Sequence, residues 1–342
     1  MSKVRWGILS AANIAYEQMV PALRRSENAV VSAIASRTKE KAEKFKIPTI
    51  YESYEELVHD PTIDAIYIPL PNSLHKEWAI KAMDAGKHVL LEKPAVLEEK
   101  DMIEIKEAVE RNNVVFMEAF MYQFHKQHAK VKELLDSGII GDYQHVKAHF
   151  SYQLDDPNNV RLDKELGGGA MWDVGCYGMH AITQIVGMKP VKFSMTGHIH
   201  PEYGVDISST CVLIDQDNRT AEISSSMELP FIDYYEIFGS EGTIRVDGSF
   251  RPDQSSLDQR GKVTVKDIQN NVIYKEAFQS DQYLEQVEHF QECIKENKSP
   301  KYNADHSIEM IRYIQKSYES LYNNSVITEV PEGSLLFKKP TC

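Results

Sequence analysis

The alternation of short apolar runs with amphipathic stretches in the first third of the chain restricts its possible folds more than any other feature. Apolar runs begin at Val4 (VRWGIL), Ala29 (AVVSAIAS), Asp64 (DAIYIPL), Lys87 (KHVLLEKP) and Val114 (VVFMEAF). Amphipathic stretches, expected as helices, lie at 15–24, 38–45 and 73–86. Runs rich in valine and isoleucine are typical of strands covered on both faces of a parallel sheet. The alternation therefore predicts an α/β domain built from βαβ units.

The pattern changes near residue 120. After a helix that ends at Gly138, longer segments alternate with period two: YQHVKAHFSYQL, PVKFSMTGHIH, SSTCVLID, TAEISSSMEL and YYEIFGSEGTIRVDG. Two helices are expected at 283–295 and 307–322. Period-two alternation between Gly, Asp and Asn turns predicts a mostly antiparallel open sheet with one face covered by solvent or a partner. We therefore expect one domain over 1–121 and an α+β domain over 122–342.

Charge and composition exclude several classes of function. The 342 residues carry a formal net charge of -13, which argues against a nucleic-acid or anionic-membrane surface because both need a basic patch. No apolar run approaches the roughly 20 residues that span a bilayer, and MSKVRWGIL lacks the apolar core of a signal peptide. The cysteines at 176, 211, 293 and 342 show no metal-binding spacing, so we expect no metal site and a reduced, cytoplasmic setting.

The turn after the first strand reads SAANIA, from Ser10 to Ala15. Aligned to the dinucleotide motif GxGxxG, it has small residues in place of all three glycines, and such residues still let a pyrophosphate approach a helix N-terminus. From this stretch alone, an ordinary βα turn fits equally well. The candidate cofactor contacts here are Ser10, Ala12, Asn13 and Ile14.

The end of the second strand carries cations where an NAD site usually has a carboxylate for the ribose hydroxyls. The sequence there is Ala35-Ser36-Arg37-Thr38-Lys39, and Lys41 follows. Arginine suits phosphate geometry, so Ser36, Arg37 and Lys41 predict the 2'-phosphate of NADP. The alternative is a solvated helix start, although cations there oppose the helix dipole unless an anion is near.

Two further strands end in polar residues, at the sheet edge where open α/β sheets bind ligands. PLPNSLH places Pro69, Asn72 and His75 after one strand, and EKP places Glu92 and Lys93 after the next. A lysine there needs a partner, so Glu92 as a plain salt-bridge acceptor is the alternative to a functional role.

The segment GGGAMWDVGCYGMH (167–180) is the most informative of the chain. Its glycines open a helix and can let the backbone approach a ligand. Asp173, Tyr177 and His180 have the spacing of one helix face. A carboxylate, a phenol and an imidazole on one face can form a proton-transfer site, while the alternative is a merely solvated polar stripe.

Taken together, these motifs resemble the Gfo/Idh/MocA family of NAD(P)-dependent oxidoreductases. The cues are GILSAANIA, ASR, PNSLH, EKP, GGGAMWDVGCY, GSEGTI (239–244) and DQY (281–283), in the family's order. The chain is most similar to the branch of glucose-fructose oxidoreductase, D-xylose dehydrogenase and dimeric dihydrodiol dehydrogenase, which carries Tyr at the position of Tyr177. The resemblance implies an N-terminal Rossmann dinucleotide-binding domain and a C-terminal domain for substrate binding and oligomerisation.

The resemblance also implies roles for particular residues. Lys93 and Tyr177 would be the catalytic pair, with a cis peptide bond after Lys93, and Asp173 and Arg161 would bind the substrate. The cofactor would be held by Ser10 and Ile14 at the turn, by Ser36 and Arg37 at the 2'-phosphate, and by Asn72 and His75 at the nicotinamide end. Gln123 and Lys126 depart from the family pattern at positions that bear on the substrate.

The expected activity is hydride transfer between NADP, with NAD possible, and a sugar or diol carbon. Free tyrosine has a pKa near 10, and a neighbouring ammonium lowers it, so Tyr177 with Lys93 would handle the proton. Lys93 alone or His180 as the base are alternatives. A non-catalytic NADP-binding sensor and a reductase of a non-sugar carbonyl are the competing functions. The resemblance implies a homodimer or homotetramer.

Overall fold

The computed structural model describes residues 3–256 and 258–331 and divides into two compact units. The first unit comprises the described residues up to Met121 together with Asp281–Ile311; the second comprises Tyr122–Ser280 and the described residues from Arg312. The division after residue 121 coincides with the expected boundary, but 281–311, expected in the second domain, belongs to the first unit. The reason is packing that the sequence pattern cannot reveal: Phe290 lies against Trp6, with ring centroids 5.4 Å apart, and Arg25 pairs with Asp281 at 2.6 Å.

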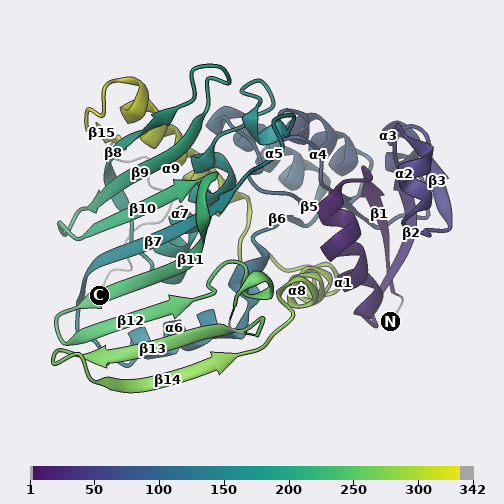
Figure 1. Cartoon of the computed structure of the whole chain (residues 1–342). Coiled ribbons are helices and arrows are strands. Elements are labelled where there is room, and N and C mark those ends of the chain that lie inside the picture. Colours follow the sequence, from purple (N-terminus) through teal and green to yellow (C-terminus); the bar gives the residue numbers. More distant parts are fainter. Residues whose placement is uncertain (1–2, 257, 332–342) are drawn as a thin grey trace. The chain divides into compact units, whose positions relative to one another are not determined.

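The first unit contains the predicted parallel sheet. Its six strands run in the order β3-β2-β1-β4-β5-β6, and every neighbouring pair is parallel (Figure 1). The strands are β1 (Val4–Leu9), β2 (Ala29–Ala35), β3 (Thr49–Tyr51), β4 (Ala65–Ile68), β5 (His88–Leu91) and β6 (Phe116–Glu118). The helices are α1 (Val20–Arg25), α2 (Lys39–Glu43), α3 (Tyr54–Val58), α4 (His75–Asp84), α5 (Glu99–Asn112) and α8 (Gln282–Glu296). The apolar runs are thus the buried strands of a Rossmann-like α/β unit.

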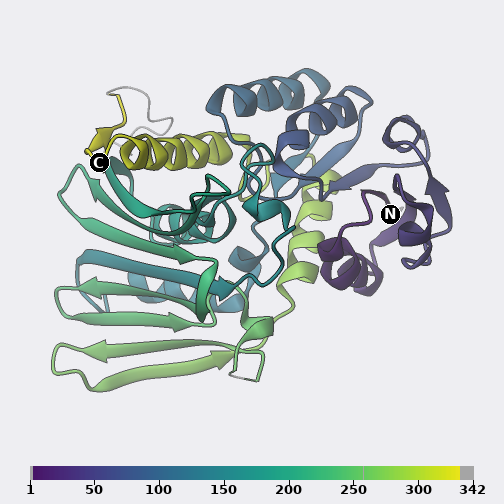
Figure 2. The ribbon, with the colours of Figure 1, turned by 45° about the horizontal axis from the view of Figure 1, so that its top comes forward.

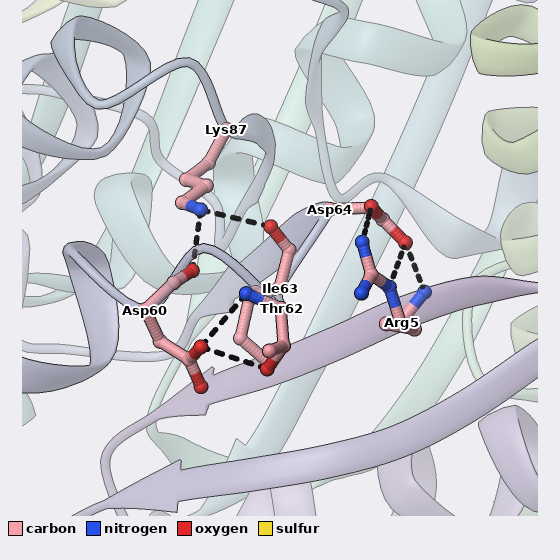
Figure 3. A network of polar contacts seen from close by, with 6 residues as sticks. All are labelled: Arg5, Asp60, Thr62, Ile63, Asp64 and Lys87. Atoms are coloured by element: carbon pink, nitrogen blue, oxygen red, sulfur yellow. Dashed lines mark hydrogen bonds and ion pairs between the residues drawn. The ribbon is translucent and has the colours of Figure 1, made fainter.

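Polar side chains fix the amino ends of β1, β4 and β5 (Figure 3). The buried Lys87 ammonium, just before β5, donates to the carbonyl oxygens of Asp60 (2.6 Å) and Ile63 (2.9 Å), and burial lowers the pKa of this lysine. Arg5 of β1 pairs with Asp64 at 2.6 Å. These contacts bind the segment before β4 to the neighbouring strands β1 and β5. They lie at the amino ends of the strands, whereas the candidate cofactor residues lie at the carboxyl ends.

The second unit contains a nine-stranded sheet in the order β14-β13-β12-β11-β7-β10-β9-β8-β15. Only the described β7–β10 pair is parallel, so the predicted mostly antiparallel sheet is confirmed. The strands are β7 (Tyr143–Gln153), β8 (Pro190–Ile199), β9 (Asp206–Asp215), β10 (Thr220–Ser226), β11 (Glu228–Gly239), β12 (Gly242–Asp247), β13 (Gly261–Asp267), β14 (Val272–Phe278) and β15 (Thr328–Glu329). The helices are α6 (Lys126–Asp136), α7 (Cys176–His180) and α9 (Ala304–Tyr322), of which 304–311 belong to the first unit.

Period-two alternation separates the two faces of this sheet. One face is apolar and packs against the helices α6 and α7 (Figure 2). Phe193 of β8 stacks on Tyr313 of α9, with ring centroids 5.5 Å apart. The other face carries a row of alternating charges, because the register places these residues side by side: Glu222, Lys147, Glu236 and Arg245 on β10, β7, β11 and β12. This face is the one expected to be covered by solvent or by a partner.

Several elements lie outside the predicted segments. They are β3, α3, α5, the β13–β14 hairpin and β15. The β13 sequence GKVTVKD does alternate, and the structure buries Gly261, Val263 and Val265 along it. The period-two pattern of β13 is sufficient to predict a strand. In contrast, β3 and β15 have only three and two residues, too few to show a pattern.

Ser10 keeps the backbone conformation of the glycine that it replaces. Its φ is 124°, in a region that side chains other than glycine rarely adopt, and its amide donates to the carbonyl of Ala35 at 3.0 Å. Such a residue is strained, typically at a cost of roughly 1–3 kcal/mol. The turn therefore retains the geometry of the dinucleotide motif although the glycine has been lost.

We predict that Ser10→Gly raises the free energy of unfolding by about 1 kcal/mol, because relief of strain exceeds the roughly 0.5–1 kcal/mol entropic cost of glycine. Urea denaturation of both proteins measures the difference. Ala12→Gly is the matched control, since Ala12 is not among the residues with positive φ and should lose stability. A Ser10→Gly protein no more stable than the wild type would show that this conformation costs nothing.

Candidate functional site

The turn between β1 and the following helix can accommodate a dinucleotide phosphate. The helix begins at Asn13, and the side chains of Ser10 and Ala12 before it are small and half-buried. Residues 15–19 form a π-helical stretch, where Ala15 and Met19 point into the core. Small side chains at this helix start leave the main-chain amides approachable by an anion. The predicted residues Ser10, Ala12, Asn13 and Ile14 therefore lie together at one turn.

At the end of β2, the three residues predicted to bind the 2'-phosphate differ in their exposure to solvent. Ser36 is buried, and its hydroxyl donates to the carbonyl of Thr38 (3.0 Å) and accepts the Thr38 amide (3.1 Å). Ser36 therefore shapes the turn. Arg37 and Lys41 are exposed beside it, so both of these predicted cations can reach a phosphate.

The ends of β4 and β5 carry the next predicted residues. Pro69 is buried behind β4, and Asn72 begins a 3-10 turn at Asn72–Leu74. After β5, the Glu92 carboxylate accepts the Tyr67 hydroxyl at 2.5 Å and the Lys93 amide at 3.3 Å. The peptide bond from Lys93 to the following proline is cis, as the resemblance implies.

His75 occupies a different environment from the one expected at a nicotinamide. Its side chain is 0% exposed, Nε2 lies 2.7 Å from the carbonyl oxygen of Leu70, and Nδ1 lies 2.9 Å from that of Pro94. Burial lowers the pKa of His75 and outweighs these carbonyl contacts. A neutral imidazole has one N–H, so His75 donates either to the end of β4 or to the segment after Lys93 and lies between the two, a position that the motif PNSLH does not reveal.

In the second unit, the glycines before Asp173 are needed for close packing of the chain itself. A Cβ on Gly168 would lie 2.3 Å from the carbonyl oxygen of Arg161, and one on Gly169 would lie 2.3 Å from Asp206 Oδ1. Gly169 also has a φ of +128°. The sequence interpretation, that these glycines admit a ligand, is therefore replaced by a structural reason at these two positions.

Asp206, at the start of β9, secures the helix that follows the glycines. Its carboxylate is buried and accepts the Met171 amide at 2.9 Å and the Tyr318 hydroxyl at 2.6 Å. Burial raises the pKa of Asp206 to about 6, although both hydrogen bonds oppose the shift. The helix is further distorted by π-helical stretches at Met171–Gly175 and Ala181–Ile185, so its side chains depart from ideal 3.6-residue spacing.

Asp173 lies in a small polar cluster. Its Oδ2 accepts the Tyr152 hydroxyl at 2.7 Å and lies 2.9 Å from Arg161 Nε. The Asp173 charge raises the pKa of the half-buried Arg161, with smaller contributions from Tyr152 and Tyr177. The structure therefore brings three predicted residues, Arg161, Asp173 and Tyr177, into one neighbourhood and adds Tyr152 of β7.

Tyr177 and His180 differ in what surrounds them. The Tyr177 ring lies 5.4 Å from Phe150 and 5.6 Å from Phe250, centroid to centroid, so an aromatic wall fixes its orientation. His180 is 0% exposed, and its Nδ1 lies 2.7 Å from the Tyr122 hydroxyl. His180 therefore belongs to the core, and the alternative of a solvated polar stripe does not hold at this residue.

Three residues that contact the candidate site were not predicted from the sequence: Tyr152, Asp206 and Glu118. Tyr152 is one of several aromatic residues in an alternating strand, and nothing in that pattern links it to Asp173. The two acids are buried, at 1% and 0% exposure, and bind main-chain amides far away in sequence. An acid within an apolar run, as in VVFMEAF, is the one local signal that could have found Glu118.

The described part of the chain contains neither a metal cluster nor a membrane-spanning helix. Within 3–256 and 258–331, no group of three or more His, Cys, Asp or Glu residues is placed to hold a metal ion. Over the same residues, no helix has the length and apolar character to cross a membrane. Cys176, Cys211 and Cys293 carry buried thiol groups, and Cys342 lies outside the described residues.

Family models match residues in both units of the chain. The model described as "Oxidoreductase family, NAD-binding Rossmann fold" matches residues 4–120, and the "GFO/IDH/MocA C-terminal domain" matches residues 128–245. The chain belongs to the GFO/IDH/MocA family of oxidoreductases.

The relatives of this chain include a sugar enzyme and a diol enzyme. The chain is 32% identical to D-xylose 1-dehydrogenase (NADP(+)) 2 of Haloferax volcanii over 94% of this chain and 98% of the relative. It is 32% identical to trans-1,2-dihydrobenzene-1,2-diol dehydrogenase of Xenopus laevis over 85% and 89%. A 3-ketoreductase from Actinomadura kijaniata, solved with NADP and TDP-benzene, superposes with a TM-score of 0.86 at 25% identity, covering 94% and 98%.

We predict that wild-type stability, relative to Asp206→Asn, falls as the pH rises from about 4 to about 6. The native pKa of Asp206 lies above its ordinary value, so the unfolded chain binds fewer protons in this interval and rising pH favours unfolding. Asparagine cannot titrate, so the variant lacks this contribution.

Urea denaturation at several pH values measures the difference between the two curves. Asp217→Asn is the control, because the Asp217 side chain is 56% exposed and should give a curve parallel to the wild type. Parallel curves for Asp206→Asn as well would contradict a buried carboxyl with a raised pKa.

Proposed function

We propose that the protein is an NADP-dependent oxidoreductase that transfers a hydride between the nicotinamide and a hydroxyl or carbonyl carbon of a sugar or diol. The observation that carries this proposal is the Asp173 cluster, in which Tyr152 and Arg161 hold a carboxylate four residues before Tyr177. Hydrogen-bonding groups fixed in this way suit a polyhydroxylated substrate. The domain up to residue 121 would bind the dinucleotide, and that from 122 the substrate.

The residues of the first unit fit NADP. The turn at Ser10, Ala12, Asn13 and Ile14 would hold the pyrophosphate, and Arg37 and Lys41 would face the 2'-phosphate, with Ser36 shaping their turn. Pro69, Asn72 and Glu92 would lie toward the nicotinamide end. NADP supplies or accepts the hydride when bound. NAD would also bind, more weakly, because it lacks the phosphate that the cations recognise.

Tyr177 would take the proton of the substrate hydroxyl, and Lys93 would hold the same oxygen. An ammonium near a phenol favours the phenolate, which makes tyrosine a usable base near neutral pH. Asp173 would orient the substrate through a second hydroxyl, supported by Arg161. In the reductive direction, the same groups would return the proton.

The relatives support a small polyol, sugar or carbonyl as substrate, since their names include a xylose dehydrogenase, a dihydrodiol dehydrogenase and a 3-ketoreductase. Arg161 is paired with Asp173, so the two charges largely cancel, which favours a neutral substrate over a phosphorylated one. A panel of sugars, diols and ketones, each with NADP and NAD, tests this. Binding without turnover throughout would instead favour a non-catalytic sensor. The cytoplasmic setting stays a prediction.

We predict that Arg37→Ala weakens NADP binding at least about tenfold, because a hydrogen bond to a charged group contributes about 1.5–3 kcal/mol. NAD binding should change little, since NAD lacks the 2'-phosphate. Fluorescence titration of both cofactors measures the two dissociation constants. An equal loss for NAD and NADP would remove Arg37 from the phosphate site.

We predict that Tyr177→Phe lowers kcat by about 10²–10⁴-fold, because it removes the titrating oxygen and keeps the ring. NADP affinity should hardly change. Lys93→Met should be at least as damaging, and the double variant far from additive, since the two groups act as one unit. A mild Tyr177→Phe defect would favour Lys93 as the base, and loss of turnover in His180→Ala would favour His180.

We predict a homodimer or homotetramer in solution that buries the charged face of the nine-stranded sheet in an interface above about 1,000 Å². Alternating charges such as Lys147 and Glu236 can pair with a second copy in a self-complementary way. Light scattering at micromolar concentration measures the mass, and a charge reversal at Lys147 should weaken assembly. A monomer would refute this prediction.

A further inference from the structure

The segment that follows β5 is held by buried side chains from other parts of the first unit. The Glu118 carboxylate, at the end of β6, accepts the Ala95 amide at 2.8 Å. On the carbonyl side, His75 Nδ1 lies 2.9 Å from the Pro94 oxygen and 3.1 Å from the Ala95 oxygen. In the two residues after Lys93, Glu118 therefore accepts one amide and His75 contacts two carbonyl oxygens.

Glu118 is itself fixed and fully buried. Its second oxygen accepts the Ser307 hydroxyl at 2.6 Å, from the part of α9 that belongs to the first unit, and its exposure is 0%. Burial raises the pKa of Glu118 to about 7; the bonds from Ser307 and Ala95 and the Lys93 charge oppose the shift, and Glu92 adds to it. A buried acid is costly unless it makes hydrogen bonds, and here one of those bonds, from the Ala95 amide, comes from the Lys93 segment.

We propose that Glu118 is a positioning residue for Lys93: through the Ala95 amide it fixes the backbone that carries the lysine, with His75 acting on the carbonyl side. The importance of this position rests on the proposed function, in which Lys93 holds the reacting oxygen. Catalysis is sensitive to displacements of about 1 Å, which can cost about 100-fold in rate. The hydrogen-bond acceptor, and not the negative charge, is the feature of Glu118 that this role requires.

Three variants of the full-length protein separate the acceptor from the charge. Glu118→Gln removes the charge and keeps an oxygen that can accept the Ala95 amide. Glu118→Leu removes both and leaves that amide unpaired. Asp215→Asn is the matched control, because Asp215 is also a buried carboxylate that accepts main-chain amides, from residues 217 and 219 in the second unit.

The first readout is independent of activity. The cofactor-free protein is labelled with trace acetic anhydride, and modification of Lys93 relative to the exposed Lys44 is measured by peptide mass spectrometry. We expect Lys93 to react at least about threefold faster in Glu118→Leu, because release of its backbone exposes the amine more often. Glu118→Gln and Asp215→Asn should react as the wild type does.

The second readout is turnover with the best substrate. Glu118→Leu should lower kcat by about 10–100-fold and leave the dissociation constant of NADP unchanged, whereas Glu118→Gln should stay within a few-fold of the wild type. If Glu118→Leu does not fold, Ser307→Ala replaces it, since loss of the hydroxyl loosens Glu118 and should speed Lys93 labelling in the same direction.

Unchanged Lys93 labelling in Glu118→Leu, or equal acceleration in Glu118→Gln and Glu118→Leu, would overturn the proposal. These outcomes are distinct from a failure of the proposed function, which would appear as a wild-type protein that turns over no sugar, diol or ketone. Faster labelling in Glu118→Leu alone would still support the positioning role in that case.

Discussion

The hydrogen bonds around residues 92–95 are the constraint on which the candidate chemistry depends. The sheet pairing of β5 ends at Leu91, so the backbone beyond it must find other partners. The Glu92 amide donates to the Ile68 carbonyl. After it the partners are side chains: Glu92 accepts the Lys93 amide, Glu118 accepts the Ala95 amide, and His75 contacts the carbonyls that follow. A lysine at the end of a buried strand thereby acquires a defined position without being on a regular element.

In the second unit, a buried carboxylate likewise holds the segment that carries the candidate residues. Asp206 accepts the amide of Met171 at the start of the distorted helix and so fixes the segment that carries Asp173 and Tyr177. Tyr152 then orients Asp173 from the neighbouring strand β7. In both units a buried carboxylate with a raised pKa holds main-chain amides close to the functional side chain. The hydrogen bonds that each acid makes offset part of the cost of burying it.

Local sequence patterns predicted the elements that depend on local periodicity. The βαβ alternation identified the parallel sheet, and period-two segments identified most of the antiparallel one. What the patterns could not provide depends on residues distant in sequence: the packing of 281–311 on the first unit, the use of both His75 nitrogens by main-chain carbonyls, and the close approach that requires Gly168 and Gly169. Sequence motifs identified the candidate residues, and the structure identified the side chains and main-chain groups that surround them.

The central claim is that the Lys93 ammonium makes Tyr177 a usable base. The most direct test is the pH dependence of kcat/KM for sugar oxidation with NADP, in the wild type, Lys93→Arg and Lys93→Met. The account predicts that the wild type loses activity below an apparent pKa well under about 10, the value of free tyrosine. Lys93→Arg keeps the cation and should show the same apparent pKa as the wild type. In Lys93→Met the apparent pKa of this low-pH limb of the profile should rise toward about 10. An unshifted limb in Lys93→Met would contradict the claim.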